Sequence, residues 1–147
     1  VYCALTNQSM PVSATEEMPK EQDAPAMSIE QMRKVCDAAS EYLAASKAYL
    51  KPDISLALFS KEANISQRTL SRAINGYLKI NFFEFINRMR VEEAKQKLMD
   101  LETSGYNIDS IYEECGFRSR SSFFMVFKKI EGKSPAAWLE DRNKHAS

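Results

Sequence analysis

The sequence predicts an all-α fold, in which two helix-turn-helix subdomains are joined by a long linking helix and preceded by an extra amphipathic helix. Apolar residues recur with helical spacing, and no segment shows the two-residue alternation of a strand. A short helix, a tight turn and a capped second helix follow one another at residues 54–76 and again at residues 107–130. Between these two units, an apolar stripe with helical spacing occupies residues 81–102.

Size and composition are consistent with this fold. A chain of 147 residues with 44% hydrophobic and 27% charged residues is ordinary for a globular domain with an extension. The first 50 residues hold 4 Lys and Arg against 7 Asp and Glu, whereas residues 51–147 hold 16 against 13. This modestly basic body favours a polyanionic partner without establishing one.

The amino-terminal residues 1–26 are expected to be a flexible linker or the end of a preceding region, because residues 6–26 are polar, rich in proline and without periodicity. The chain begins with Val1, and Val1–Leu5 lacks the basic region of a complete signal peptide. We therefore expect a fragment of a longer protein.

Residues 27–52 are expected to form an amphipathic N-terminal helix. Its apolar stripe begins at Ile29 and runs to Leu50, and Pro52 ends the helix because proline disfavours a helical residue before it. The stripe is wider than a coiled-coil seam, so docking on the following domain is the simpler interpretation. A homodimer through residues 28–50, or through a missing N-terminal region, is the alternative.

The first unit is expected at residues 53–80. A short helix is followed by a turn at Asn64, which suits a left-handed conformation, and Ser66 is a good N-cap for the second helix. We expect that helix to end near Asn75-Gly76. Its predicted inward positions are Leu70, Ile74 and Tyr77.

The linking helix is expected at residues 81–102, capped by Asn81 and stopped by Thr103-Ser104-Gly105. Arg90 lies on the same helical stripe as the apolar residues and is therefore expected to point inward. A structural role in a hydrogen-bonded ion pair is the simpler interpretation, since a buried charge must be paired, and a DNA contact is the alternative.

The second unit is expected at residues 106–132. Asn107 caps a short helix, a turn follows at Cys115-Gly116-Phe117, and Ser119 caps the second helix. Ser134 followed by Pro135 predicts a C-terminal helix at residues 134–140, which leaves residues 141–147 as a tail.

In each unit the second helix has a face that packing does not use, and these faces are the predicted DNA-binding sites. Arginine can reach two acceptors of a guanine edge at once, serine and asparagine can contact bases or phosphates, and apolar side chains can contact thymine methyl groups. The first face consists of Ser66, Gln67, Arg68, Ser71, Arg72 and Asn75. The second consists of Ser119, Arg120, Ser121, Phe124, Met125 and Lys128.

Two alternatives concern these faces. Phe124 or Met125 can turn inward and pack in the core instead of reading DNA. The whole module can also be a helical protein-interaction module, in which Arg68, Arg72 and Arg120 meet an acidic partner. The linking helix spans roughly 30 Å, close to the roughly 34 Å between successive major-groove faces, which favours double-stranded DNA and two adjacent grooves.

The sequence argues against an enzyme and against bound groups. It has one His, four Gly without a phosphate-binding loop, and no carboxylate pair beside a nucleophile, so no catalytic residue, cofactor or small-molecule ligand is expected. Cys3, Cys36 and Cys115 lack the spacing of zinc ligands, so no metal is expected either. Cys36 and Cys115 are expected to be small buried hydrophobes in a protein of the reducing cytoplasm.

Over about residues 54–140 the sequence resembles the AraC/XylS transcriptional regulators. The matching segments are ISLALFSKEANISQRTLSRAIN, FFEFINRMRVEEAKQKL and IDSIYEECGFRSRSSFFMVFKKIEGKSPAAW. The last is the most specific, with its Gly-Phe turn, serine-rich helix start, Phe-Lys-Lys, and Gly-x-Ser-Pro before an aromatic residue. The resemblance implies seven helices, and sequence-specific DNA binding by an activator that recruits or positions RNA polymerase.

By position, the resemblance implies base reading by Arg68, Ser71 and Arg72 and by Arg120, Ser121 and Met125, and Arg90 matches a basic position of the linking helix. The chain departs from the family in three places. Ser60 and Tyr112 stand where the family usually has Ala, and Met125 stands at an often basic position. Relatives usually carry a sensor or dimerisation region on the amino side. VYCAL resembles the exit of a transmembrane helix in membrane-anchored relatives, so the full-length protein could be anchored while its DNA-binding part is cytoplasmic.

Overall fold

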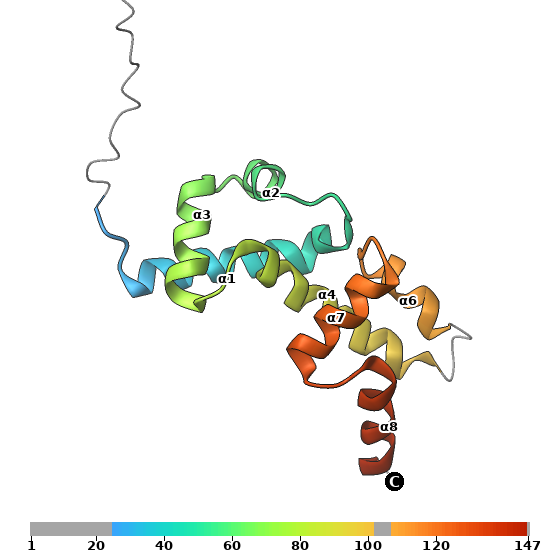
Figure 1. Ribbon diagram of the computed structural model, residues 1–147. Coiled ribbons are helices and arrows are strands. Elements are labelled where there is room, and N and C mark those ends of the chain that lie inside the picture. Colours follow the sequence, from blue (N-terminus) through green and yellow to red (C-terminus); the bar gives the residue numbers. More distant parts are fainter. Residues whose placement is uncertain (1–24, 102–106, 147) are drawn as a thin grey trace, which may run out of the picture.

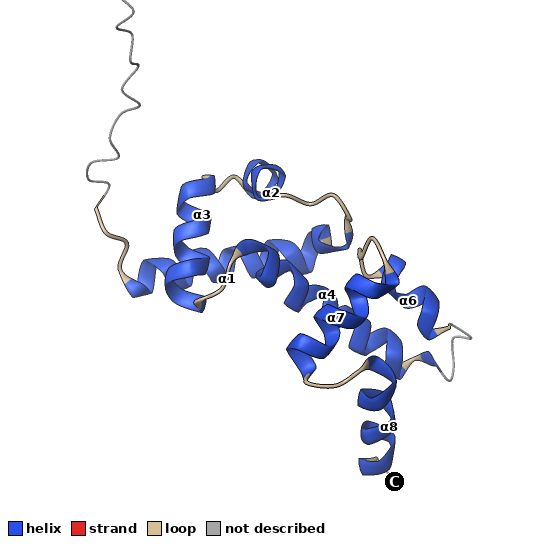
Figure 2. Cartoon of the chain, viewed as in Figure 1, coloured by secondary structure: helices blue, strands red, loops and turns tan. Residues whose placement is uncertain are grey.

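The computed structural model describes residues 25–101 and 107–146. In these two stretches every regular element is a helix, and the helices form two groups joined by α4 (Figures 1 and 2). The predicted linker before residue 25 and the predicted helix stop at Thr103-Ser104-Gly105 lie outside the described residues. The all-α prediction with two helix-turn-helix subdomains is confirmed.

Helix α1 (Ile29–Ser46) begins at Ser28, whose hydroxyl accepts a hydrogen bond from the Gln31 amide while the Gln31 side chain accepts one from the Ser28 amide. It ends at Lys47, which has a left-handed φ of 51°, and a short 3₁₀ helix, η1 (Ala48–Leu50), follows. The prediction of one helix up to Leu50 is therefore wrong, because the turn at Lys47 redirects the chain into the core. Ile29, the predicted first residue of the apolar stripe, is 73% exposed and does not join the core.

The first helix-turn-helix consists of α2 (Leu56–Ala63) and α3 (Gln67–Ala73), with Asn64 left-handed at a φ of 55° and Ser66 as the N-cap of α3. Instead of ending near Asn75-Gly76, the helix continues as a π-helical turn, η2 (Ile74–Leu78). A π turn holds more residues than an α turn, so Tyr77 leaves the inward stripe and is 37% exposed, contrary to the prediction.

Helix α4 (Phe82–Met99) links the units, α6 (Ile108–Glu114) and α7 (Arg120–Glu131) form the second helix-turn-helix, and α8 (Pro135–His145) closes the chain. Their N-caps are the expected ones: Asn81, Asn107, Ser119 and Ser134. Helix α8 is longer than predicted, because residues 141–145 continue it instead of forming a tail. Its last turn carries basic side chains, which suit the negative end of a helix dipole.

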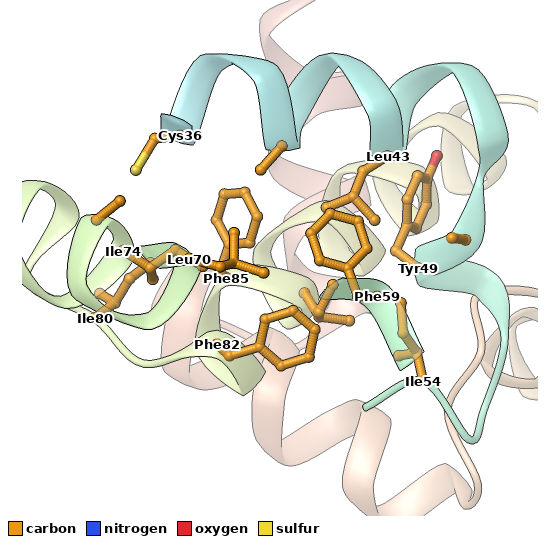
Figure 3. Close-up of a cluster of buried hydrophobic side chains, with 14 residues drawn as sticks. Cys36, Leu43, Tyr49, Ile54, Phe59, Leu70, Ile74, Ile80, Phe82 and Phe85 are labelled. Carbon is orange, nitrogen blue, oxygen red and sulfur yellow. The ribbon is translucent and has the colours of Figure 1, made fainter. Parts of the chain in front are cut away.

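Two separate apolar cores lie along α4. The first is made by α1, α2, α3 and the start of α4 (Figure 3), and its central side chains include Leu43, Phe59, Leu70, Ile74 and Phe85. The second is made by the rest of α4 with α6 and α7, and it contains Val91, Ala94, Leu98, Ile111, Cys115, Phe117, Phe123 and Phe127. Each helix-turn-helix is thus stabilised by its own core.

Helix α1 lies against α3 and contributes Cys36, Ala39 and Leu43 to the first core. The structure thus has the docked arrangement, and the apolar stripe that a dimer would need is buried within the chain. Cys36 and Cys115 are 3% and 0% exposed, as expected for small hydrophobes. Burial raises the pKa of both thiols, that of Cys115 to about 12.

Candidate nucleic-acid interface

The first candidate reading helix is α3. Leu70 and Ala73 are fully buried against the first core, and this fixes the opposite face of α3 outward. On that face Gln67 and Arg68 are exposed and Arg72 is half-buried. The polar side chains therefore form a surface stripe that the core does not use.

Hydrogen bonds within the first unit order several of these side chains. The Ser66 hydroxyl accepts from the Thr69 amide at 3.1 Å and donates to the Thr69 hydroxyl at 2.8 Å, so it acts first as a helix cap. The exposed Asn75, within η2, donates from Nδ2 to the hydroxyl of the half-buried Ser71 at 3.2 Å. The structure thus brings Ser71 and Asn75 together on one edge of the stripe.

The second candidate reading helix, α7, is anchored by Phe123 and Phe127, which are both fully buried. Ser119, Arg120, Ser121 and Lys128 are exposed, and Met125 is 68% exposed. Phe124 is half-buried and packs edge-on against Phe123, with ring centroids 5.4 Å apart. Of the two apolar residues on this face, Phe124 is thus the one that turns toward the core.

Arg120 is held by two neighbours. Its guanidinium lies 4.9 Å from the centroid of the Phe124 ring, and its Nε lies 2.7 Å from Oδ1 of Asp109 at the start of α6. Together with Ser121, Arg120 and Phe124 line a shallow hollow in the surface. Sequence reasoning missed Asp109, since an acidic residue in the first turn is already explained by the helix dipole.

A groove of about 350 Å³ runs beside α7, between it and the start of α4. Its apolar walls include Met125 and Phe83, and Phe83 is 65% exposed. Polar side chains, Asn81, Glu84, Asn87 and Lys129, form its rim. Sequence reasoning also missed Phe83, although it falls off the buried stripe of α4 and its exposure is predictable from that position.

Arg90 points inward and is 9% exposed, in agreement with a structural role. Its partners are not those of the predicted ion pair: Nε donates to the carbonyl of Tyr49 at 2.7 Å and Nη2 to the carbonyl of Lys51 at 2.9 Å. The Tyr49 carbonyl lies in the short helix η1, where the last backbone acceptors lack helical partners. The Lys51 carbonyl also accepts a hydrogen bond from the Ile54 amide at 3.3 Å. The guanidinium carbon lies 5.5 Å from the centroid of the Phe117 ring, and burial lowers the pKa of Arg90.

The two residues that replace the small residue of the first helix are accommodated differently. Ser60 is buried, and its hydroxyl donates to the carbonyl of Ile65 at 2.5 Å, which closes the turn of the first unit. Tyr112 lies half-buried at the edge of the second core, and its hydroxyl donates to Glu113 at 2.9 Å. The larger ring thus avoids the centre of the core.

The described part of the chain has neither a metal-binding cluster nor a membrane-spanning helix. There, no three His, Cys, Asp or Glu side chains are grouped so that they could bind a metal ion. No helix within residues 25–101 and 107–146 has the length and apolar character needed to span a membrane.

Comparisons with known sequences agree with this geometry. A family model described as a helix-turn-helix domain matches residues 59–141, which is more than half of the chain. An uncharacterised HTH-type transcriptional regulator of Staphylococcus aureus strain COL is 29% identical over 113 residues, which are 77% of this chain and 14% of the regulator. Histidine kinase P4 of Formosa agariphila is 32% identical over 80 residues, which are 54% of this chain and 6% of the kinase. The chain thus spans only a small part of these curated relatives.

Solved structures give the same result. The C-terminal domain of AraT, a response regulator from Geobacillus stearothermophilus, is 27% identical and superposes with a TM-score of 0.57, covering 76% of this chain and 84% of that domain. The DNA-binding domain of AdpA, solved in complex with a target DNA, is 23% identical with a TM-score of 0.59, covering 76% of this chain and 94% of that domain. This second likeness shows the shared fold. The chain belongs to the AraC-type helix-turn-helix family of DNA-binding transcription regulators.

Proposed function

We propose that this part of the protein binds double-stranded DNA at a bipartite site, with α3 in one major groove and α7 in the next. The observation that carries the proposal is the pair of capped helices, each anchored by its own core and each with a polar face turned outward. The 18 residues of α4 span about 27 Å at 1.5 Å per residue. That length is comparable with the roughly 34 Å between successive major-groove faces. The AdpA domain, which shares this fold, was solved with its target DNA.

The proposed roles follow from the chemistry of each face. Arg68 and Arg72 would contact guanine edges with the two-pronged guanidinium, and Ser71 and Asn75 would contact neighbouring bases or phosphates. Ser66 would mainly order the start of α3, and Gln67 would contact the DNA beside it.

In the second unit, Arg120 and Ser121 would contact base edges, and Met125 would contact a thymine methyl group. Phe124 would support Arg120 from below, since its ring already lies under the guanidinium. Ser119 would mainly cap α7, and Lys128 would contact phosphate at the far end of the face.

Activation of transcription is the proposed outcome of this binding, through recruitment or positioning of RNA polymerase. We propose no catalytic role for this module. We also propose that it acts in the cytoplasm, where its target DNA is expected to be. We place self-association in the region before α1, because the apolar stripe of α1 is buried against α3.

Selection of bound sites from random duplex DNA tests the bipartite proposal. We expect two half-sites with centres about 10 base pairs apart. The affinity for the selected site should fall linearly on a log-log plot against salt concentration, because phosphate contacts release counterions. A selection that enriches one short site, or none, would contradict the proposal.

Arg72→Ala tests base reading by the first unit. We expect a loss of about 1–3 kcal/mol of discrimination at one base pair of the first half-site, with the second half-site unchanged. Arg33→Ala is the matched control, because it removes the same charge from an exposed position of α1 outside both faces. Equal effects of the two substitutions would mean that Arg72 contributes only general charge.

A further inference from the structure

The two cores meet at one place on α4. Phe82, Phe85 and Ile86 in its first half belong to the first core, and Val91, Ala94 and Leu98 in its second half belong to the second. Arg90 lies between these two sets. Its position on α4 therefore allows it to contact both units.

Residues 47–52, which we call the strap, connect α1 to the first helix-turn-helix and lie against this junction. Arg90 donates to the strap carbonyls of Tyr49 and Lys51, and its guanidinium lies over the ring of Phe117 in the second unit. Arg118 donates from Nε to the carbonyl of Pro52 at 3.3 Å. Two arginines thus hold the strap against the second unit.

The turn of the second unit also touches the strap directly. Gly116 has a φ of 81°, and a Cβ built on it would lie 2.7 Å from the carbonyl oxygen of Leu50 and 2.9 Å from that of Tyr49. A side chain at this position would push the turn away from the strap. The close approach therefore depends on glycine, because glycine tolerates the positive φ and has no Cβ to collide with the strap carbonyls.

The Tyr49 side chain extends the same contact along α4. Its hydroxyl donates to Glu93 at 2.9 Å, and Lys47 Nζ lies 3.1 Å from the same carboxylate. The pKa of Glu93 is lowered, because these hydrogen bonds outweigh the effect of its burial. The strap is therefore fixed to α4 at both of its ends.

We propose that Arg90 is a positioning residue, which clamps the strap and the second unit together and so fixes the orientation of α7 relative to α3. The inference rests on the proposed bipartite binding and assigns the preferred spacing of the half-sites to this clamp. The planar guanidinium satisfies two carbonyls and lies on an aromatic ring at once, and a lysine ammonium cannot reproduce that geometry. Because the strap is continuous with α1, a displacement of α1 would reach α7 through the same contacts.

The test compares the chain with its Arg90→Lys variant on DNA with the selected half-site spacing and on DNA with one or two base pairs added between the half-sites. We expect the unaltered chain to bind the longer spacings about tenfold or more weakly than the selected spacing. A loss of this size corresponds to the loss of one good base contact. Arg90→Lys should bind all spacings within a few-fold of one another, while its affinity for an isolated half-site stays unchanged. Arg88→Lys is the matched control, because Arg88 is an exposed arginine of the same helix.

A distance measurement without DNA tests the clamp independently. Ala57 on α2 and Ala136 on α8 are exposed and can be changed to Cys and spin-labelled in a Cys3→Ser background, while Cys36 and Cys115 stay protected by burial. We expect a narrow distance distribution in the otherwise unaltered chain and a broad one in Arg90→Lys. Arg118→Ala and Gly116→Ala should broaden it as well, and Arg118 is exposed, so its removal spares both cores.

The outcomes are distinguishable. If the chain binds no bipartite DNA, the proposed function fails and the distance measurement still decides whether Arg90 clamps the units. If Arg90→Lys keeps both the spacing preference and the narrow distribution, the inference is overturned. If Arg90→Lys unfolds, the Arg118→Ala variant decides, and an unchanged distribution there overturns it too.

Discussion

Phe123→Ala is predicted to open the second unit while the first stays folded. The Phe123 side chain is fully buried, and its ring centroid lies 5.3 Å from that of Phe117 and 5.7 Å from that of Phe127. Truncation of a buried phenylalanine costs about 3–5 kcal/mol, as lost transfer free energy plus a cavity. Small domains are stable by only about 5–15 kcal/mol in total, so the second core should open at low urea.

Three natural probes separate the two cores in this experiment. Trp138, the one tryptophan of the chain, lies against Phe127 with centroids 6.2 Å apart, so its fluorescence follows the second core. Cys115 belongs to the second core and Cys36 to the first, so the rates at which these thiols react with a disulfide reagent report each core separately. With a typical urea dependence of about 2 kcal/mol per molar, the Trp138 transition should move by roughly 2 M.

Phe83→Ala is the matched control, because that phenylalanine is 65% exposed and its truncation should leave the transition almost unchanged. In the Phe123→Ala variant, Cys36 should stay protected from the disulfide reagent up to a higher urea concentration than Cys115. If both thiols lose protection at the same urea concentration, the two cores unfold as one unit and the reasoning is refuted.

Three further predictions concern single contacts. Ser66→Ala should destabilise the first unit by about 1 kcal/mol, as measured by Cys36 protection, because the cap of α3 is lost. Asp109→Asn should free Arg120 and raise DNA affinity with a steeper salt dependence in a fluorescence titration, whereas Glu140→Gln, an exposed carboxylate paired on α8, should not. Burial and the hydrogen bond to Glu93 raise the pKa of Tyr49 to about 12. The stabilisation by neutral Tyr49 is therefore complete below about pH 10 and lost as pH rises toward 12, so the stability lost in Tyr49→Phe should shrink over that range in urea titrations.

Local signals predicted most of this fold. Ser66, Asn81, Asn107 and Ser119 each cap a helix at the expected place, because a cap depends on one side chain and the amides two or three residues beyond it. The left-handed turn at Asn64 is local in the same way. The element order of both units was therefore readable from residue types and spacing.

Features that depend on tertiary packing could not be predicted in this way. Lys47 adopts a left-handed conformation without being glycine or asparagine, because the chain turns there to bury Ala48 and Tyr49. Tyr77 faces outward because η2 is a π turn, and no residue type within η2 predicts a π turn from the sequence.

In the candidate site too, local features could be predicted from the sequence and tertiary contacts could not. The outward placement of Arg68 and Met125 follows from helical periodicity and agrees with their exposure. The carbonyl partners of Arg90 come from residues about forty positions earlier in the chain, and the carboxylate beside Arg120 comes from the preceding helix. Long-range pairs of this kind leave no periodic pattern in the sequence.

The separation of the two cores has a consequence for how such a protein can diversify. Outward residues of α3 and of α7 contribute to no common core, so selection can alter one recognition surface while the scaffold under the other is conserved. Residues 107–146 can accordingly be exchanged between relatives, provided that the new segment fits its contacts with the rest of the chain. The incoming segment must fill the second core against Val91, Ala94 and Leu98 of α4. It must also keep a glycine at Gly116, an aromatic ring at Phe117 and a donor at Arg118, which contact the strap and Arg90.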